Sequence, residues 1–575
     1  MNLTNGILEL SASDLSNHIA CNHLSFLNLS MAKGEIAAPE YRDPMLALLQ
    51  ERGQEFENAY LNSLREQGKQ VDLVSSEGNE TAFEHTVAAM KAGKDVIYQG
   101  SLRSGRWLGR ADFLERVDKP STLGAWSYEV VDSKLAKETR AGTLLQLCLY
   151  AELVAEIQGV MPEYIHVVTP EDGFKRLSHR VDDYLAYYRL VKRNLERFIE
   201  SDDIPATYPV PVTHCDICRW WQSCTGRRRA DDHLSLVAGL ANTHAKQING
   251  WQVSTLAGYA QMQLPLPKPA KGAKETYVRL REQARVQLEA REKAETVYEC
   301  LPLETGRGLA RLPEPSQGDV FFDFEGDPFA GTSGMEYLFG FVSEYAPGEY
   351  RSFWAFSPEQ EKAAFESFVD LMMENWERYP DFHIYHFTGY ETGALKRLAG
   401  KYGTREEEVD RLLRGQRFVD LHSITRQALR AGVETYSLKE LEQFHGFIRQ
   451  LELREASSQL RLLEGLLERN NVAAITDETK QAVEQYNKED CLSTRELRVW
   501  LEQLRSEQIL GGSDIPRPPL GEGTPSEGLT EYQEKIKPVF DALIASIPAD
   551  SAERTKEQQA RWLLAHMLDW YRREK

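Results

Sequence analysis

The stretch that most constrains the fold of this chain is Val320-Phe-Phe-Asp-Phe-Glu-Gly326, an apolar run interrupted by two acids. Its valine and phenylalanines are typical of a buried β-strand. Asp323 and Glu325 are two residues apart, so on a strand their side chains project from the same face. Two carboxylates side by side on a buried strand repel each other and lose hydration, which a divalent cation can offset. The stretch therefore predicts a strand that carries a metal site, while a strand end with two hydrated acids is the simpler alternative.

Three later segments carry further acids in settings that favour the metal site. The first reads as a strand that opens into an amphipathic helix and places Glu391 at the start of that helix. The second is a short apolar strand that carries Asp420. The third reads as a helix in which Tyr486 and Asp490 are four residues apart and therefore lie on one face.

In this order, the D-x-E pair, the middle acid and the Y-x-x-x-D helix resemble the DnaQ-like 3′–5′ exonucleases of the tyrosine subtype, which have the RNase H fold. The resemblance covers roughly residues 318–504. It implies that Tyr486 orients the attacking water and that two Mg²⁺ or Mn²⁺ ions are bound by three acids. These acids are Asp323, Glu325 and Asp490. The family usually has Asp at the middle position, where this chain has Glu391, and Asp420 is the reserve ligand.

Length and composition set limits on the kind of protein this is. A chain of 575 residues, 42% hydrophobic and 27% charged, is long enough for three or more globular domains. No apolar run is as long as a transmembrane helix and the first residues lack the pattern of a signal peptide, so we expect a cytoplasmic protein without membrane association. The formal charge of −20 argues against nucleic-acid binding over the whole surface, so a groove for a polyanion must be local.

A second acidic site is predicted in a strand-rich region between residues 95 and 135. Asp112 lies on one strand of a predicted hairpin, and Asp132 and Lys134 share one face of the next strand. Two acids that bind a metal beside a lysine that polarises water or phosphate form a hydrolytic arrangement. The alternative is an ordinary surface hairpin with an Asp–Lys pair.

Together with Gln146 and Tyr150 on the following helix, these residues resemble the PD-(D/E)xK core of RecB-family nucleases, with its G-x-x-D, D-x-K and Q-x-x-x-Y signatures. The resemblance implies a second nuclease site with one or two Mg²⁺ or Mn²⁺ ions. The family also has a metal-supporting histidine on an early helix, at a position where this chain has Phe56. The residues that can take its place are His85, Glu55 and Glu57.

Seven cysteines are too few and too clustered for a disulfide framework, and they indicate a metal site or a cluster. Cys215, Cys218 and Cys224 form a C-x₂-C-x₅-C array, and Cys21 is a distant fourth candidate. The arrangement resembles the iron–sulfur nucleases of the RecB family, which implies a [4Fe–4S] cluster held by these four thiols. Zinc is the alternative, bound by four cysteines or by three with either His23 or His214.

Basic and aromatic residues surround the cysteine array. Such residues bind single-stranded nucleic acid by stacking on bases and contacting phosphates. Packing over the cluster, with the arginines in ion pairs, is the alternative. The candidate nucleic-acid-binding residues are Arg219, Trp220, Trp221, Arg227 and Arg228.

We therefore expect a multidomain protein of the mixed α/β (α+β) class. Its parts are a restriction-endonuclease-like PD-(D/E)xK domain (1–230), a helical connector (231–300), an RNase H-like exonuclease domain (301–508), a flexible linker (509–529) and a C-terminal helical segment (530–575). Relatives with this order often continue into a helicase. No Walker A motif occurs here, so we expect no ATP hydrolysis by this chain, and a helicase would act as a separate partner.

The predicted function is a metal-dependent nuclease that acts on single-stranded DNA or strand ends, in repair, recombination or defence. Phe56 and Glu391 favour an alternative, a nucleic-acid-binding scaffold in which one or both sites are degenerate. RNA is the alternative substrate, because the RNase H fold serves either polymer and no residue pattern here reads a 2′-hydroxyl.

Overall fold

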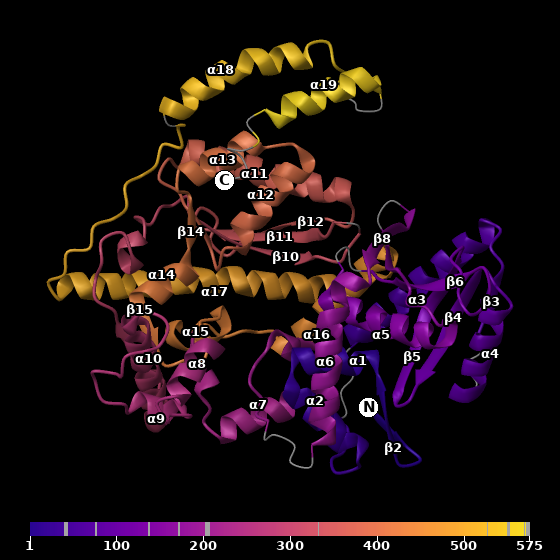
Figure 1. The fold of residues 1–575 in the computed structure, drawn as a ribbon. Coiled ribbons are helices and arrows are strands. Elements are labelled where there is room, and N and C mark those ends of the chain that lie inside the picture. Colours follow the sequence, from indigo (N-terminus) through magenta and orange to yellow (C-terminus); the bar gives the residue numbers. More distant parts are fainter. Residues whose placement is uncertain are drawn as a thin grey trace. The chain divides into compact units, whose positions relative to one another are not determined.

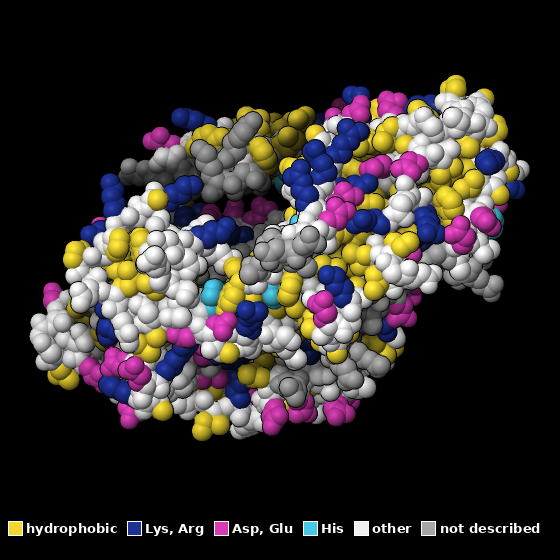
Figure 2. All heavy atoms as spheres, turned by 60° about the horizontal axis from the view of Figure 1, so that its bottom comes forward, with side chains coloured by type: hydrophobic (Ala, Val, Ile, Leu, Met, Phe, Trp, Pro, Cys, Tyr) yellow, Lys and Arg dark blue, Asp and Glu magenta, His cyan; other side chains and the backbone are white. Residues whose placement is uncertain are grey.

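The computed structural model describes residues 1–39, 44–74, 78–135, 139–170, 173–201, 207–331, 333–525, 527–548, 553–568 and 570. The chain divides into two compact units, Met1–Lys293 and Ala294–Lys575, and Figure 1 shows the elements of each. Among the described helices, none combines the length and the apolar character that crossing a bilayer requires. Basic and acidic side chains are interspersed over the face drawn in Figure 2.

A mixed sheet forms the centre of the first unit, with eight strands among the described residues. Its longest ladders are antiparallel and join β4 to β5 and β5 to β6, so the hairpin expected around Asp112 and Asp132 is present. Strand β7 then runs parallel to β6. The strands are β1 (Asn2–Thr4), β2 (Ile7–Ser11), β3 (Val71–Leu73), β4 (Val96–Ser104), β5 (Trp107–Val117), β6 (Ser127–Ser133), β7 (Tyr164–Thr169) and β8 (Lys175–Arg180).

Helix α5 (Ala141–Gln158) packs its leucine-rich sequence into the core of this unit, where Leu145, Leu149 and Leu153 are buried. It ends at Gly159, whose φ of 71° is a left-handed conformation that glycine adopts without strain. The other helices before the connector are α1 (Ala12–Ala20), α2 (Asn22–Ala32), α3 (Pro44–Glu66), α4 (Asn79–Lys91), α6 (Asp182–Glu200), η2 (Thr213–Ile217) and α7 (Trp221–Ala230).

Residues 231–293 of the expected helical connector (231–300) belong to the first unit, and its last residues belong to the second. Its helices bury a small core of their own, including Ile248, Leu256, Tyr259 and Leu280. They are η3 (Leu234–Leu236), α8 (Asn242–Asn249), α9 (Leu256–Ala260) and α10 (Lys274–Lys293).

The second unit is built on a five-stranded sheet with the order β12-β11-β10-β13-β14. The central strand β10 is antiparallel to β11 and parallel to β13, so it is hydrogen-bonded on both sides. The strands are β10 (Val320–Asp327), β11 (Met335–Ser343), β12 (Tyr350–Trp354), β13 (Ile384–His386) and β14 (Phe418–Asp420), and a separate pair joins β9 (Tyr298–Cys300) to β15 (Leu429–Ala431).

The alternation of side chains along β10 separates two cores. Val320, Phe322 and Phe324 pack with residues of α11 (Pro358–Arg378), α12 (Tyr390–Tyr402) and α13 (Glu406–Arg414). Phe321 packs on the other face, with residues of α14 (Leu421–Ala428), α15 (Leu438–His445) and α17 (Asp477–Leu510). Figure 1 shows α11–α13 and α17 on opposite sides of the sheet. Asp323 and Glu325 have the parity of Phe321, so they project towards α17.

Segment 509–529 is the expected flexible linker. Its described part lacks strands and has helix only at its two ends, but its middle is bound to the rest of the second unit. Arg517 donates to the Glu502 carboxylate at 2.5 Å and to the Pro313 carbonyl at 2.9 Å. Ile515 is buried in the core beside α17, and the Gly521 carbonyl accepts a hydrogen bond from Arg417 at 2.9 Å. The remaining helices of the unit are η4 (Gly308–Arg311), α16 (Leu453–Glu468), η5 (Val472–Ala474), α18 (Glu527–Ile544) and α19 (Lys556–Met567).

Candidate metal centres

The first candidate centre lies where β10 meets helix α17. Donor atoms of Asp323, Glu325 and Asp490 all lie within 4.8 Å of one another, and no other group of three histidine, cysteine or acidic donors in the described part of the chain is this close. Asp323 and Glu325 come from β10 and Asp490 from α17. Carboxylate oxygens at this spacing are what Mg²⁺ and Mn²⁺ prefer, so the residues fit such an ion.

Mutual repulsion and burial show why a cation suits this place. Burial raises the pKa of Asp323 well above its ordinary value, and the neighbouring carboxylates of Glu325 and Asp490 raise it further. Burial raises the pKa of Glu325 to about 8, and Asp490 again adds to the effect. Ionising these groups without a counter-ion is therefore unfavourable, and a bound divalent cation removes that cost.

Asn487, which the sequence analysis did not single out, holds the two acids of β10 in place. Its amide donates to Asp323 Oδ2 at 3.1 Å and to Glu325 Oε1 at 3.4 Å, while its carbonyl accepts from the Tyr350 hydroxyl at 2.9 Å. The side chain is fully buried and fits only because Gly340, the partner of Asp323 across the β10–β11 ladder, has no Cβ. In the sequence, its position next to Tyr486 is the one feature that could have pointed to Asn487 as a residue of the site.

Tyr486 lies one turn before Asp490, as the i, i+4 spacing predicts, and two further basic residues reach the same carboxylate. Lys439 Nζ is 2.8 Å from the Tyr486 hydroxyl oxygen and 3.1 Å from Asp490 Oδ2. Arg449 binds Asp490 Oδ1 at 2.5 Å. Burial raises the pKa of Tyr486 to about 12, so its hydroxyl keeps its proton near neutral pH. The sequence analysis missed Lys439 and Arg449.

The predicted middle acid and the reserve ligand lie outside the group of three. Glu391 is buried in the first turn of α12, where its carboxylate is 3.2 Å from Nδ1 of His386. It is close enough to raise the pKa of Asp323, but it is not within ligand distance of the group. Asp420 caps the N-terminus of α14 and accepts hydrogen bonds from two backbone amides.

The second candidate centre is the β5–β6 hairpin of the first unit. Asp112 Oδ2 accepts from the backbone N–H of Ser133 at 2.9 Å, and Lys134 Nζ is 2.7 Å from Asp132 Oδ2. Asp132 is almost fully buried, and burial, followed by repulsion from Asp112, raises its pKa to about 7. The three side chains predicted from the hairpin pattern therefore lie together.

Helix α5 supplies the other two residues predicted for this centre. Gln146 Nε2 donates to Asp132 Oδ1 at 3.2 Å and lies 3.5 Å from the Tyr150 hydroxyl. The Tyr150 ring lies against Gly109 on β5, where a Cβ would meet its ring carbons at 2.7 Å. Gly109 therefore allows α5 to approach the strand that carries Asp112.

Of the three residues that can replace the missing histidine, Glu57 lies beside the centre. Burial raises its pKa, the Asp112 carboxylate raises it further, and Lys134 acts in the opposite direction. Its carboxylate also accepts a hydrogen bond from Gln99. Phe56 instead packs in the apolar cluster of Tyr60 and Val131, Glu55 is exposed, and His85 pairs with Asp72 at 2.9 Å.

The four predicted cluster ligands line one small pocket, which Cys21 reaches from the junction of α1 and α2. None of them forms a disulfide bond. Burial raises the pKa of the Cys224 thiol to about 11, and the nearby Cys218 adds to the effect. His23 and His214, the alternative zinc ligands, line the same pocket, and its cysteines are Cys21, Cys215, Cys218 and Cys224.

The five residues predicted to bind nucleic acid near the cysteines are divided between interior and surface. Trp220 is 4% exposed and lies 3.3 Å from Asn28 through its indole nitrogen, and Arg228 is buried with a hydrogen bond to the Pro209 carbonyl. Trp221 is exposed, as is Arg227, which pairs with Asp231 at 3.6 Å. Arg219 lies 3.4 Å from the same Asn28 side chain. The buried Trp220 beside the cysteine pocket and the Arg227–Asp231 ion pair thus agree with the alternative interpretation.

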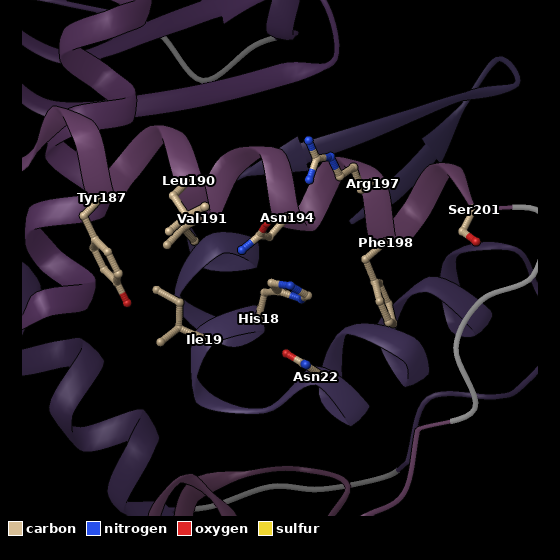
Figure 3. A pocket seen from close by; sticks show the side chains of 10 residues that line it. All are labelled: His18, Ile19, Asn22, Tyr187, Leu190, Val191, Asn194, Arg197, Phe198 and Ser201. Carbon is tan, nitrogen blue, oxygen red and sulfur yellow. The ribbon is translucent and has the colours of Figure 1, made fainter.

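The first unit also has an open cavity of about 570 Å³ between α1 and α6 (Figure 3). Tyr187, Leu190 and Phe198 of α6 face His18 and Ile19 of α1 across it. None of the predicted site residues lines this cavity.

The central strand of this α/β domain presents paired carboxylates to an acid on a long helix, an arrangement that can hold a divalent cation. Residues 320–502 match the family model of the RNase H superfamily. The match begins at β10 and ends within α17, so it includes Asp323, Glu325 and Asp490. The second unit therefore contains the predicted RNase H-like domain, and this indicates a nuclease-type activity. A search of curated proteins returns no match to the chain.

Proposed function

We propose that this protein is a metal-dependent nuclease with two hydrolytic centres that acts on DNA, at single strands or strand ends. The observation that carries the proposal is the convergence of Asp323, Glu325 and Asp490 within 4.8 Å, in the region that matches the RNase H superfamily. These three residues would hold Mg²⁺ or Mn²⁺. A divalent ion supplies positive charge to a phosphodiester and makes water a better nucleophile.

The residues around the ligands have roles that follow from their contacts. Asn487 keeps the carboxylates of Asp323 and Glu325 in one orientation, so the ligands are positioned before an ion arrives. The Tyr486 hydroxyl accepts a hydrogen bond from Lys439, which leaves its own proton free to be donated to a water or a phosphate oxygen. Tyr486 therefore orients the nucleophile or the substrate in this proposal.

The second centre would use Asp112 and Asp132 as ligands, with Glu57 as the third acid. Lys134 lies 2.7 Å from Asp132, and in this arrangement it can stabilise charge on a phosphate or a water. Gln146 fixes the orientation of Asp132 through the hydrogen bond from its amide. These contacts support a PD-(D/E)xK type of nuclease centre.

We also propose that the four cysteines hold a [4Fe–4S] cluster. The four thiols line one pocket, although Cys21 is far from the other three in the sequence. A [4Fe–4S] cluster takes one thiolate on each of its four irons, so the four cysteines match its ligand count. Zinc bound by the four cysteines, or by three of them with His23 or His214, is the alternative.

The cluster is tested by metal analysis of the full chain purified without oxygen. We expect about four irons per chain, as Cys₄ ligation of this cluster requires, and their loss in Cys224→Ala. Cys148→Ala is the matched control, because Cys148 is buried in α5 and outside the pocket. A colourless protein with one zinc per chain would refute the cluster.

The nuclease proposal is tested on labelled single-stranded DNA in Mg²⁺ and in Mn²⁺. Asp323→Ala and Asp132→Ala each remove a ligand from one centre, and we expect each to lose part of the cleavage and the double variant to lose all of it. Glu349→Gln changes an exposed acid in a surface pair with Arg351 and should leave the rate unchanged. Matched RNA strands run in parallel identify the preferred polymer. Wild-type rates in the double variant would refute the proposal, and DNA binding without cleavage by the wild type would indicate a scaffold.

A further inference from the structure

Lys439 is a feature of the RNase H-like centre that two bound ions do not explain. Its ammonium group lies 3.1 Å from Asp490 Oδ2 and 2.8 Å from the Tyr486 hydroxyl oxygen. It also lies 4.8 Å from the centroid of the Tyr486 ring. A basic side chain thus lies against a ligand carboxylate of the centre.

The second basic residue at Asp490 is already balanced by another acid. Arg449 binds Glu442 Oε1 at 2.6 Å in addition to Asp490 Oδ1, and Glu442 also accepts from the Ser493 hydroxyl. Lys439, in contrast, forms its ion pair in the described chain with Asp490. Lys439 therefore places a positive charge of its own beside the three ligand carboxylates, whose mutual repulsion it offsets in part.

The ligands available in the structure favour a single ion. A second ion about 3.5–4 Å from the first needs a bridging carboxylate and further donors of its own. The acids that could provide them are engaged elsewhere, because Glu391 pairs with His386 and Asp420 caps α14. Three carboxylate oxygens would leave three positions for water in the six-coordinate shell that a single Mg²⁺ prefers.

We infer that the RNase H-like centre holds one tightly bound divalent ion and that Lys439 supplies the second positive charge, beside Tyr486. The inference rests on the proposed nuclease function and revises the expectation of two ions. In this arrangement the ammonium group stabilises negative charge on the phosphate that lies against the tyrosine. Lys439 also repels the metal ion, so it weakens metal binding while it promotes cleavage.

The test counts Mn²⁺ ions bound to the full chain by equilibrium dialysis and electron paramagnetic resonance. An Asp132→Asn background removes the ligand of the other centre. We expect one tight Mn²⁺ per chain, without the signal of two exchange-coupled ions. Lys439→Met should bind this ion at least about tenfold more tightly, because a like charge within a few ångströms is removed, and should cleave DNA at least about a hundredfold more slowly.

Two further variants separate the role of the charge from a structural role. Lys439→Arg keeps the charge and should retain one Mn²⁺ with wild-type affinity. Lys396→Met makes the same substitution at an exposed position on α12 and should change neither metal affinity nor cleavage. Melting curves without metal establish that each variant folds.

The results separate this inference from the function on which it rests. Two tight Mn²⁺ ions in the lysine-containing protein, or metal binding in Lys439→Met that is unchanged or weaker, would overturn the inference and leave the nuclease proposal intact. If Asp323→Ala in the same background still bound the Mn²⁺ ion, the metal centre itself would be refuted, and the inference with it.

Discussion

Replacing Gly340 by alanine tests how the RNase H-like centre is built. Gly340 pairs with Asp323 across the β10–β11 ladder, and a Cβ at this position would collide with the side-chain oxygen of Asn487 and with the Tyr350 hydroxyl. Asn487 has no room to retreat, because it is fully buried and bonded to Asp323 and Glu325. The substitution therefore has to displace the residue that positions two of the three ligands.

The cost can be worked out from these contacts. Overpacking a buried position costs about 1–3 kcal/mol. Breaking the Tyr350–Asn487 hydrogen bond costs about 1 kcal/mol, and weakening the hydrogen bonds to the carboxylates costs about 1.5–3 kcal/mol. We expect Gly340→Ala to lower the free energy of unfolding of the second unit by about 3.5–7 kcal/mol and to weaken Mn²⁺ binding.

Hydrogen exchange followed by mass spectrometry is the suitable assay, since peptides from β10 and β11 report on the second unit alone. It is run on the full chain in a chelator, so that metal binding does not contribute to stability. Gly393→Ala is the matched control: Gly393 lies in α12 with open space around its Cα, and the same substitution should stabilise the helix by about 0.5–1 kcal/mol. A loss below about 1 kcal/mol in Gly340→Ala, with unchanged Mn²⁺ affinity, would refute the reasoning.

Two further predictions concern charge in the interior of the second unit. Burial and neighbouring acids raise the pKa of Asp323, so its ionised form is unfavourable without metal. Asp323→Asn should therefore raise the melting temperature in a chelator at pH 8 and abolish the stabilisation by Mg²⁺. A lower melting temperature of the variant in the chelator would contradict this prediction. Burial, followed by the charge of Arg417, lowers the pKa of His383 to about 3, so the folded protein excludes a proton that the unfolded chain binds below about pH 6.5. The free energy of unfolding should therefore fall as the pH drops from 6.5 towards 3, by up to about 1.4 kcal/mol per pH unit. His383→Gln should reduce this pH dependence in urea titrations. The same pH dependence in the wild type and the variant would rule out this histidine as the cause.

The parts of the two centres that arise from a regular element could be predicted from the chain itself. Period-two alternation puts Asp323 and Glu325 on one face of β10, and the helical period puts Tyr486 one turn from Asp490. The hairpin around Asp112 and Asp132 follows from the same alternation. Such local geometry depends only on the type of secondary structure, so spacing was sufficient to predict it.

The rest depends on how separate elements pack, which spacing does not specify. Lys439 comes from α15 and reaches an acid 51 residues later in the chain, at Asp490. Asn487 lies about 100° around the helix from Tyr486, and its role depends on a glycine of another strand. Glu391 starts a helix as expected, but its contact with His386 depends on how α12 packs beside β13. The distances between the donor atoms do not place Glu391 in the group of Asp323, Glu325 and Asp490.

The anchored segment after α17 affects how the RNase H-like domain can be isolated. The family match ends at residue 502, but Arg517 binds Glu502 and Ile515 fills a place in the core beside α17. A fragment cut where the match stops would leave Glu502 at its terminus without that arginine and would expose apolar surface to water. Fragments that extend to residue 525 should express as folded protein where shorter ones aggregate, so the limits of sequence similarity are a poor guide to the smallest stable piece of this unit.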